Sequence, residues 1–228
     1  LVVLNKAGED HKYFEVGDGK NLIEYMSMSQ AIKGKFVDSE SKKINLDVGN
    51  DFDALVDGIV AGLELNQVIG NMKVISAKDA EKAWYQLQGV LFTMTRNDQI
   101  LIPQVTFYDS ATKKAGTADV VMIDTEGKIG IIDLKTSIRT IRADYYKDQA
   151  HLLADDSLLK IQGNYTELST RGQHGVQVNS YRRMAENMGY KMMRDEFGAV
   201  TTIHLLVDIG VDKDTGKKVY KGFKRLDG

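Results

Sequence analysis

The sequence AGTADVVMIDTEGKIGIIDLKTS, at 115–137, forms the centre of the expected fold. It contains two short runs rich in Val and Ile, at 119–123 and 129–134, on either side of the sequence DTEG at 124–127. Two β-forming runs joined by a short segment that ends in glycine are typical of a hairpin. This sequence therefore predicts a β-hairpin.

Charged side chains interrupt the apolar pattern of this hairpin. Asp119 opens the first strand, and Asp133 and Lys135 stand near the end of the second. Residues two apart on a strand face the same way, so Asp133 and Lys135 share a face. A three-residue loop with Gly127 in the left-handed conformation would place Asp119 opposite Asp133. A two-residue loop would instead put the two carboxylates on opposite faces of the sheet.

The first of these pairings brings two carboxylates and one ammonium group into a single patch. Facing carboxylates repel each other unless a cation lies between them, and hard oxygen ligands suit Mg²⁺ or Mn²⁺. Such a patch suits metal-assisted hydrolysis of a phosphodiester, in which the metal polarises the phosphoryl oxygen and helps to generate hydroxide. The alternative is structural: Asp119 ends a turn, and Asp133 pairs with Lys135 at a solvated edge.

Apolar residues at helical spacing predict three helices, at 51–65, 78–94 and 176–188. Two further strands are expected at 100–108 and at 201–209, the second of which is apolar on both faces. Asp51 and Asp53 stand at the start of the first helix, where they would cap it and complement its dipole. Gln177 and Tyr181, four residues apart on the third helix, lie on one face, so both polar groups would reach the same place over the sheet. Without further context this pair would be a buried contact whose polar groups are satisfied locally.

Three segments in this order resemble the RecB-like, phage-type exonuclease branch of the PD-(D/E)xK nuclease superfamily: GTAD at 116–119, IIDLKTS at 131–137 and QVNSY at 177–181. The resemblance implies an α/β fold with a restriction-endonuclease-like core, in which helices flank a small mixed β-sheet of about four or five strands around a central hairpin. We expect this core at 49–210. An N-terminal arm with a short helix is expected at 1–48, and a basic hairpin or extension at 211–228.

The resemblance also implies a metal site. Asp119 and Asp133 would bind Mg²⁺, for which Mn²⁺ may substitute in such enzymes, together with the Leu134 carbonyl. Asp53 is the further expected ligand and stands where relatives often have a histidine. On the preceding strand, Gln104 occupies a position where many relatives carry a glutamate, and an amide is the weaker ligand for a divalent cation.

The remaining implied roles concern water and DNA. Lys135 would orient and activate the attacking water and stabilise the transition state, while Gln177 and Tyr181 would place the scissile phosphate. Basic residues near tyrosines, or in the polar segments that follow the hairpin, are the expected DNA contacts: Arg139, Arg142, Arg171 and Arg182. The alternative for the first two is an exposed helix with ordinary surface charge.

Composition excludes several other classes of site. A net charge of −2 gives no overall attraction to nucleic acid, so a DNA-binding surface requires local clusters of Lys and Arg. The chain has no cysteine, which excludes disulfides, a thiol nucleophile and a Cys-ligated iron–sulfur cluster. No apolar run approaches the roughly 20 residues that span a bilayer, so we expect a cytoplasmic protein without membrane contact. A start at Leu1 rather than Met indicates a fragment, a processed product or a trimmed chain.

Together these features predict a Mg²⁺-dependent DNA nuclease, acting as an exonuclease in DNA processing, recombination or repair in a phage or bacterium. A recombinase, a helicase or a single-strand-binding protein is the expected partner class besides DNA. Two alternatives stay open. One is a DNA-binding or structural module that keeps the nuclease fold without activity, and the other is an endonuclease that dimerises to cut two strands.

Overall fold

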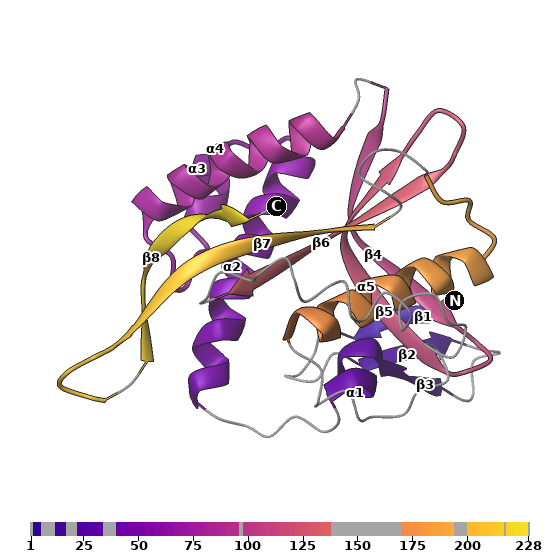
Figure 1. Cartoon of the computed structure of the whole chain (residues 1–228), viewed down its shortest axis with the longest axis horizontal. Helices are drawn as coiled ribbons and strands as arrows, with labels where there is room; N and C mark the ends of the chain where they lie inside the picture. Colours follow the sequence, from indigo (N-terminus) through magenta and orange to yellow (C-terminus); the bar gives the residue numbers. More distant parts are fainter. Residues whose placement is uncertain are drawn as a thin grey trace.

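The computed structural model describes residues 2–5, 12–16, 22–33, 40–95, 98–137, 170–193, 200–216 and 218–227 (Figure 1). The helices in these ranges are α1 (Met28–Lys33), α2 (Glu40–Val60), α3 (Leu65–Ile69), α4 (Ala77–Met94) and α5 (Thr170–Asn187). The strands are β1 (Val2–Asn5), β2 (Lys12–Val16), β3 (Leu22–Ser27), β4 (Ile100–Asp109), β5 (Lys114–Ile123), β6 (Ile129–Ser137), β7 (Val200–Val211) and β8 (Lys218–Asp227).

Within the described residues, these strands form one mixed sheet of eight strands. The order is β1-β2-β3-β5-β6-β7-β8, and β4 pairs with the other edge of β5. The β3–β5 and β6–β7 pairs are parallel, whereas the other neighbours are antiparallel. The predicted α/β class with helices flanking a mixed sheet is confirmed. The sheet is larger than expected because the N-terminal arm adds three strands to it.

The central hairpin has the predicted register. Val120 pairs with Ile132 and Ile123 with Ile129, so the same register places Asp119 opposite Asp133. The turn closes through the N–H of Asp124, which donates to the carbonyl of Lys128 at 3.0 Å. Gly127 has φ +73°, a left-handed conformation that glycine adopts without a steric penalty. The three-residue loop is therefore present, and the two-residue alternative is wrong.

Helices cover both faces of the sheet and form two apolar cores (Figure 1). The α2–α4 core contains fully buried Phe52, Leu55 and Leu87, which pack against β5, β6 and β7. The α1–α5 core contains Met28, Ile131 and Met184 on the opposite face. Burying one such side chain stabilises the fold by about 1.5–3 kcal/mol, which explains why both helix layers hold to the sheet.

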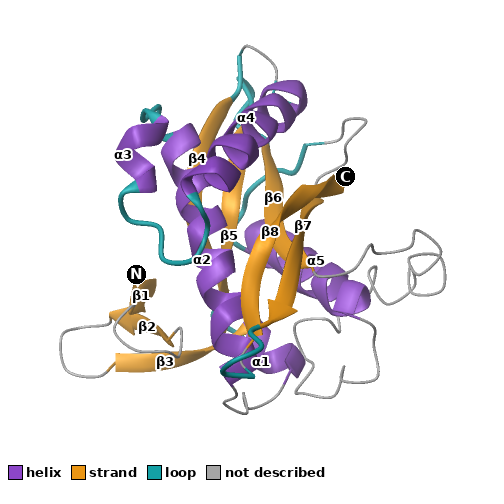
Figure 2. Ribbon diagram, turned by 90° about the vertical axis from the view of Figure 1, so that its left-hand side faces the viewer, coloured by secondary structure: helices purple, strands orange, loops and turns teal. Residues whose placement is uncertain are grey.

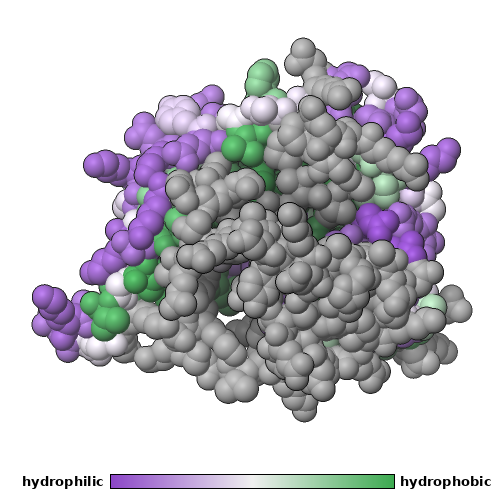
Figure 3. All heavy atoms as spheres, in the orientation of Figure 1, coloured by the Kyte–Doolittle hydropathy of each residue, from purple (hydrophilic) through white to green (hydrophobic). Residues whose placement is uncertain are grey.

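Helix α4 matches its predicted range closely and shows why it forms. Ser76 caps its start, because the Ser76 hydroxyl accepts a hydrogen bond from the N–H of Asp79 at 3.2 Å. Outward-facing side chains over α3 and the first part of α4, among them exposed Lys78 and Glu81, are hydrophilic (Figure 3). Over this first part, the helix therefore has the apolar inner face and polar outer face that its residue spacing predicts, whereas Tyr85 and Phe92 further along are exposed.

Helix α2 differs from the prediction at both ends. It begins at Glu40 rather than at 51, because buried Val48 continues the apolar stripe through Gly49 and Asn50. It ends at Val60 rather than at 65, because Gly62 adopts a left-handed conformation with φ +70°. Asp51 and Asp53 consequently lie inside the helix, and the prediction that they cap it is wrong.

The chain ends are continuous with the sheet. Figure 2 shows the three strands of the N-terminal arm lying across one end of β5. Parallel pairing of Met26 with Lys114 and of Ser27 with Ala115 joins β3 to β5. At the other end of the chain, β8 pairs with β7 and forms an edge of the sheet. The expected boundary between 48 and 49 falls inside α2.

Candidate active site

The candidate site lies where the two strands of the hairpin part. The β5–β6 ladder ends at the Val120–Ile132 pair, and Asp119 and Asp133 form the next position in register. Beyond this point β6 continues beside β7, while β3 pairs with β5 at Lys114 and Ala115. The two acidic residues therefore stand at the point where β5 and β6 stop pairing.

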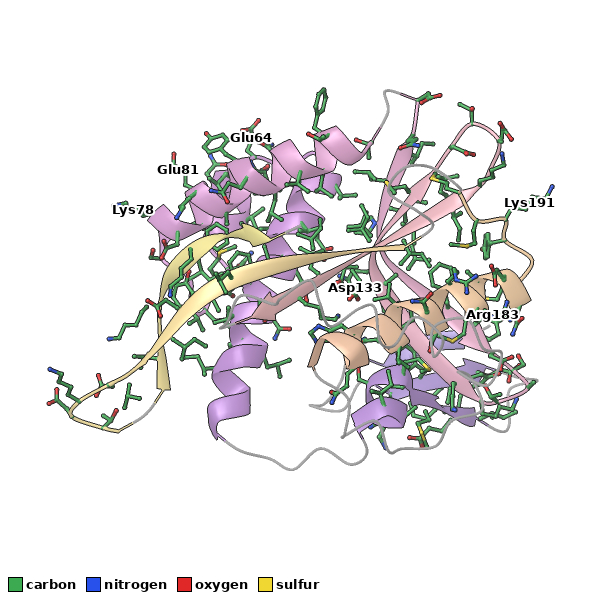
Figure 4. All side chains as sticks on the ribbon, in the orientation of Figure 1. Glu64, Lys78, Glu81, Asp133, Arg183 and Lys191 are labelled. Carbon is green, nitrogen blue, oxygen red and sulfur yellow. The ribbon has the colours of Figure 1, made fainter. Side chains whose placement is uncertain are left out.

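Asp133 and Lys135 form a close ion pair beside the end of the β5–β6 ladder. The Lys135 Nζ lies 2.7 Å from Asp133 Oδ2, and the side chains are 18% and 1% exposed. Figure 4 shows Asp133 in the interior between β6 and α5, whereas the labelled Lys78, Glu81 and Lys191 lie at the periphery. A carboxylate and an ammonium group are costly to remove from water, so their burial here rules out the solvated-edge alternative for this pair.

Asp119 is held against β6 by its own carboxylate. Asp119 Oδ2 accepts a hydrogen bond from the N–H of Leu134 at 2.6 Å. Burial raises the pKa of Asp119 well above its usual range, and the neighbouring charge of Asp133 raises it further, while Lys135 acts in the opposite direction. The two carboxylates therefore repel each other in a site with little water, which is the electrostatic condition that a bound cation relieves.

The pKa of Lys135 responds to the same pair of carboxylates. Burial lowers the pKa of this ammonium group, but attraction to Asp133 and Asp119 outweighs the burial, so the pKa lies above its usual value. Lys135 is consequently charged at neutral pH. It supplies a fixed positive charge rather than a neutral amine at this position.

The backbone around Asp119 is irregular both on its own strand, β5, and on the neighbouring strand, β4. Gln104 on β4 faces Asp119, yet it has φ +53°, a left-handed conformation that is uncommon for a residue other than glycine. On β5, Ala118 and Val121 both pack into the α1–α5 core, although an odd spacing should place them on opposite faces. Such strain is retained where the surroundings enforce it, often at functional sites.

Helix α2 brings two further carboxylates toward this irregularity. Asp57 Oδ1 accepts a hydrogen bond from the Gln104 side-chain amide at 3.4 Å. Asp53, one turn earlier, raises the pKa values of both Asp119 and Lys135 by its charge. Sequence reasoning missed Asp57 as a neighbour of the site. Its spacing of four residues from Asp53 was the available signal, because i and i+4 share a helix face.

In the described part of the chain, no three His, Asp or Glu side chains come close enough together to hold a metal ion. Asp53 thus does not complete a three-acid cluster with Asp119 and Asp133 in this conformation. The donors that the structure does bring together are the Asp119 and Asp133 carboxylates, which suit a hard divalent cation. The role of Asp53 as a ligand stays a prediction.

Asp51 has a different role from the one expected at a helix end. Its buried carboxylate accepts hydrogen bonds from the backbone N–H groups of Lys73, Val74 and Ile75 at 2.8 to 3.2 Å. These three donors belong to the connection between α3 and α4. Asp51 therefore fastens that connection to α2, and it faces away from the candidate site.

Gln177 and Tyr181 on α5 meet as predicted from their spacing. Gln177 Nε2 donates to the Tyr181 hydroxyl at 2.5 Å and lies 3.4 Å from the Ser29 hydroxyl on α1. Burial raises the pKa of Tyr181 well above its usual range, and the charge of Asp133 adds to this effect. The phenol therefore stays neutral beside the carboxylates and is able to donate a hydrogen bond.

The ring of Tyr181 lies tightly against β5. A Cβ added to Gly116 would lie 2.2 Å from Tyr181 Cε1, so only glycine fits there. This contact gives a physical reason for the glycine in the GTAD segment. It also shows that α5 and β5 approach each other closely beside Asp119, with Tyr181 between them.

The four arginines expected to contact DNA are only partly accounted for. Arg139 and Arg142 lie outside the described residues, and Arg171 lies on α5 with its side chain outside the described part. Arg182 is 23% exposed and pairs with Glu186 at 2.9 Å. Its charge is therefore already partly balanced within α5, which weakens it as a phosphate contact.

No protein-family model, no curated protein and no solved structure matches this chain. Among the residues that the structure describes, no helix is both long and apolar enough to cross a membrane.

Proposed function

We propose that this chain is a metal-dependent DNA nuclease of the PD-(D/E)xK superfamily, with a restriction-endonuclease-like core and exonuclease activity in DNA processing. The observation that carries the proposal is the group formed by buried Asp133 and partly buried Asp119 and Lys135 at the point where β5 and β6 diverge. Two facing carboxylates beside a charged lysine are unfavourable as a purely structural arrangement. They are favourable once a divalent cation and a phosphate share the space between them.

The residues present fit such a cation. The raised pKa of Asp119 reflects its burial and the charge of Asp133, and a bound cation would offset both effects. Asp119 and Asp133 would hold the ion together with the Leu134 carbonyl, and Asp53 would approach it from α2. When bound, Mg²⁺ or Mn²⁺ would polarise the phosphoryl oxygen and lower the pKa of a water molecule.

The chain's own residues supply the other functions. Lys135 stays charged and would orient the attacking water and stabilise negative charge that develops on the phosphate. Gln177 and Tyr181 hold each other in one orientation, so their polar groups would place the phosphate without reorganising. Because Tyr181 stays neutral, it would serve as a hydrogen-bond donor to a phosphate oxygen.

A direct experiment tests the proposal. Purified protein is incubated with end-labelled linear DNA and with closed circular DNA, in Mg²⁺, in Mn²⁺ and in chelator, beside Lys135→Ala. Loss of linear DNA alone, dependent on metal and absent in the variant, is the expected result. Cutting of the circle would instead identify an endonuclease.

A second candidate function is a nuclease-fold module that binds DNA without cutting it. One observation favours it: within the described residues no third acidic side chain joins the carboxylate pair, and Gln104 offers an amide where a glutamate would add a ligand. This candidate predicts DNA binding in a mobility-shift assay with no cleavage in either metal. It also predicts that Lys135→Ala leaves the affinity for DNA unchanged within about twofold, since the lysine would then have no reacting phosphate to contact.

A further inference from the structure

The N-terminal arm reaches the candidate site through Tyr13. This tyrosine lies on β2 and is 3% exposed, and its hydroxyl lies 3.2 Å from the Thr117 hydroxyl, 104 residues later in the chain. The Thr117 hydroxyl also lies 3.0 Å from that of Thr106 on β4. Because a hydroxyl both donates and accepts, Thr117 is held between the arm and β4.

The position of Thr117 gives this contact its significance. Thr117 stands two residues before Asp119, on the part of β5 that lies past the end of the β5–β6 ladder. On that side β3 pairs with β5 only at Lys114 and Ala115. The Tyr13 hydroxyl therefore ties to the arm a length of β5 that pairs with β4 along one edge but has no ladder along its other edge.

The Tyr13 hydroxyl also interacts electrostatically with Asp119 and Tyr181. Burial raises the pKa of Tyr13, and among the further causes is the charge of Asp119. Tyr13 in turn raises the pKa of Tyr181. The arm, β5 and α5 thus each bring a polar group to one region, although the arm and α5 lie far apart in the sequence.

The arm itself is firmly attached. The Tyr25 hydroxyl donates to Glu15 at 2.8 Å, and Lys113 Nζ lies 3.5 Å from the same carboxylate and 5.0 Å from the centre of the Tyr25 ring. The N–H of Met26 donates to the Lys113 carbonyl at 2.9 Å. Contacts from two strands of the arm therefore attach it to the β4–β5 turn at several points, so we expect the arm to stay in place when one of these contacts is removed.

Asp119 needs such support. It stands opposite Asp133 just past the end of the β5–β6 ladder, and two facing carboxylates favour conformations in which Asp119 turns away. We propose that the N-terminal arm completes the site, with Tyr13 acting through Thr117 as a positioning residue that keeps Asp119 directed at the place where metal and phosphate bind. This inference rests on the proposed nuclease function.

The test compares two tyrosines of the same arm. Tyr13→Phe removes the hydroxyl that reaches Thr117, whereas Tyr25→Phe removes a buried hydroxyl that points to Glu15, away from the site. Thr117→Val removes the hydroxyl that Tyr13 contacts, and Thr117→Ser retains it. Each variant is measured for Mn²⁺ affinity by electron paramagnetic resonance, for kcat and KM on linear DNA, for Tm, and for amide exchange over 115–119.

The proposal expects Tyr13→Phe to lower kcat at least about tenfold and to weaken Mn²⁺ binding, with KM and Tm near those of the wild type. Thr117→Val should lower kcat and Mn²⁺ affinity by the same amounts as Tyr13→Phe, and the double variant should lose no more of either than the single variants do. Thr117→Ser should keep kcat and Mn²⁺ affinity near those of the wild type. Tyr25→Phe should behave as the wild type. Equal effects of Tyr13→Phe and Tyr25→Phe, or losses of kcat that follow Tm alone, would overturn the proposal.

Failure of the nuclease function is distinguishable from failure of this inference. If the wild type neither cleaves DNA nor binds Mn²⁺, the proposed function is wrong, and amide exchange then decides about Tyr13. Faster exchange over 115–119 in Tyr13→Phe, with Tyr25→Phe unchanged, supports the clamp on β5. Unchanged exchange in both variants overturns it.

Discussion

The ammonium group of Lys135 lies 2.7 Å from the carboxylate of Asp133, and Asp133 is almost fully buried. If this lysine serves the chemistry, Lys135→Ala should lower kcat at least about a hundredfold, because a fixed charge beside the reacting phosphate is lost. Circular dichroism should show a folded variant. Lys128→Ala is the matched control, since Lys128 pairs with Glu126 in the exposed hairpin turn. Retained cleavage in a pure Lys135→Ala preparation would contradict the assignment.

Stability without metal should depend on Asp119. Its pKa is raised in the folded protein, so between its unfolded pKa of about 4 and its folded pKa the native state binds more protons than the unfolded state. The free energy of unfolding therefore falls as pH rises through this window. Asp119→Asn removes this pH-dependent loss of stability, because an amide does not ionise. We therefore expect the Tm of Asp119→Asn in chelator to exceed the wild-type Tm by about 2 to 4 °C near neutral pH.

Calorimetry at several pH values checks this prediction. The difference in Tm between Asp119→Asn and the wild type should grow as pH rises above about 4, because only the wild type has the buried carboxylate to ionise. Asp98→Asn, which changes an exposed carboxylate, is the matched control. A Tm difference that is the same at all pH values would mean that Asp119 is not destabilised by its charge.

Close contact between β5 and α5 predicts different outcomes for two glycines. Gly116→Ala would place a Cβ 2.2 Å from the Tyr181 ring, which has no flexible end to yield, so we expect a loss of about 1–3 kcal/mol and weaker cleavage. Gly130→Ala would place its Cβ 2.8 Å from the flexible end of Met122 and should cost less. Urea denaturation of both variants measures the difference. Equal costs would show that Tyr181 is not fixed against β5.

The hairpin was predictable because its determinants are local. Gly127 fixes a three-residue loop, the loop fixes the register, and the register places Asp119 opposite Asp133. The i and i+4 spacing of Gln177 and Tyr181 was equally local, and their side chains do meet. Local sequence patterns therefore predicted how most of the candidate site is arranged.

What the sequence did not reveal depends on distant contacts. The left-handed conformation of Gln104 is enforced by its surroundings, because nothing in the residue itself favours it. The contact of Tyr13 with Thr117 joins residues 104 positions apart, and no periodic pattern marks it. The start of α2 was missed since Gly49 and Asn50 resemble helix breakers, whereas burial of Val48 and its neighbours outweighs their low helix propensity.

Two aspartates on α2 allow folding and function to be separated. Asp51 accepts three backbone N–H groups at 73–75, so Asp51→Ala should lower the free energy of unfolding by at least about 2 kcal/mol, with a smaller loss in Asp51→Asn. At a temperature where the variant is folded, cleavage should be close to that of the wild type.

Asp53→Ala should do the reverse: it removes a charge near Asp119 and Lys135, so Tm should stay unchanged while Mn²⁺ affinity and cleavage fall. Unfolding curves and Mn²⁺ titrations of the two variants make the comparison, and a loss of stability in Asp53→Ala with unchanged Mn²⁺ binding would remove Asp53 from the proposed ligand set.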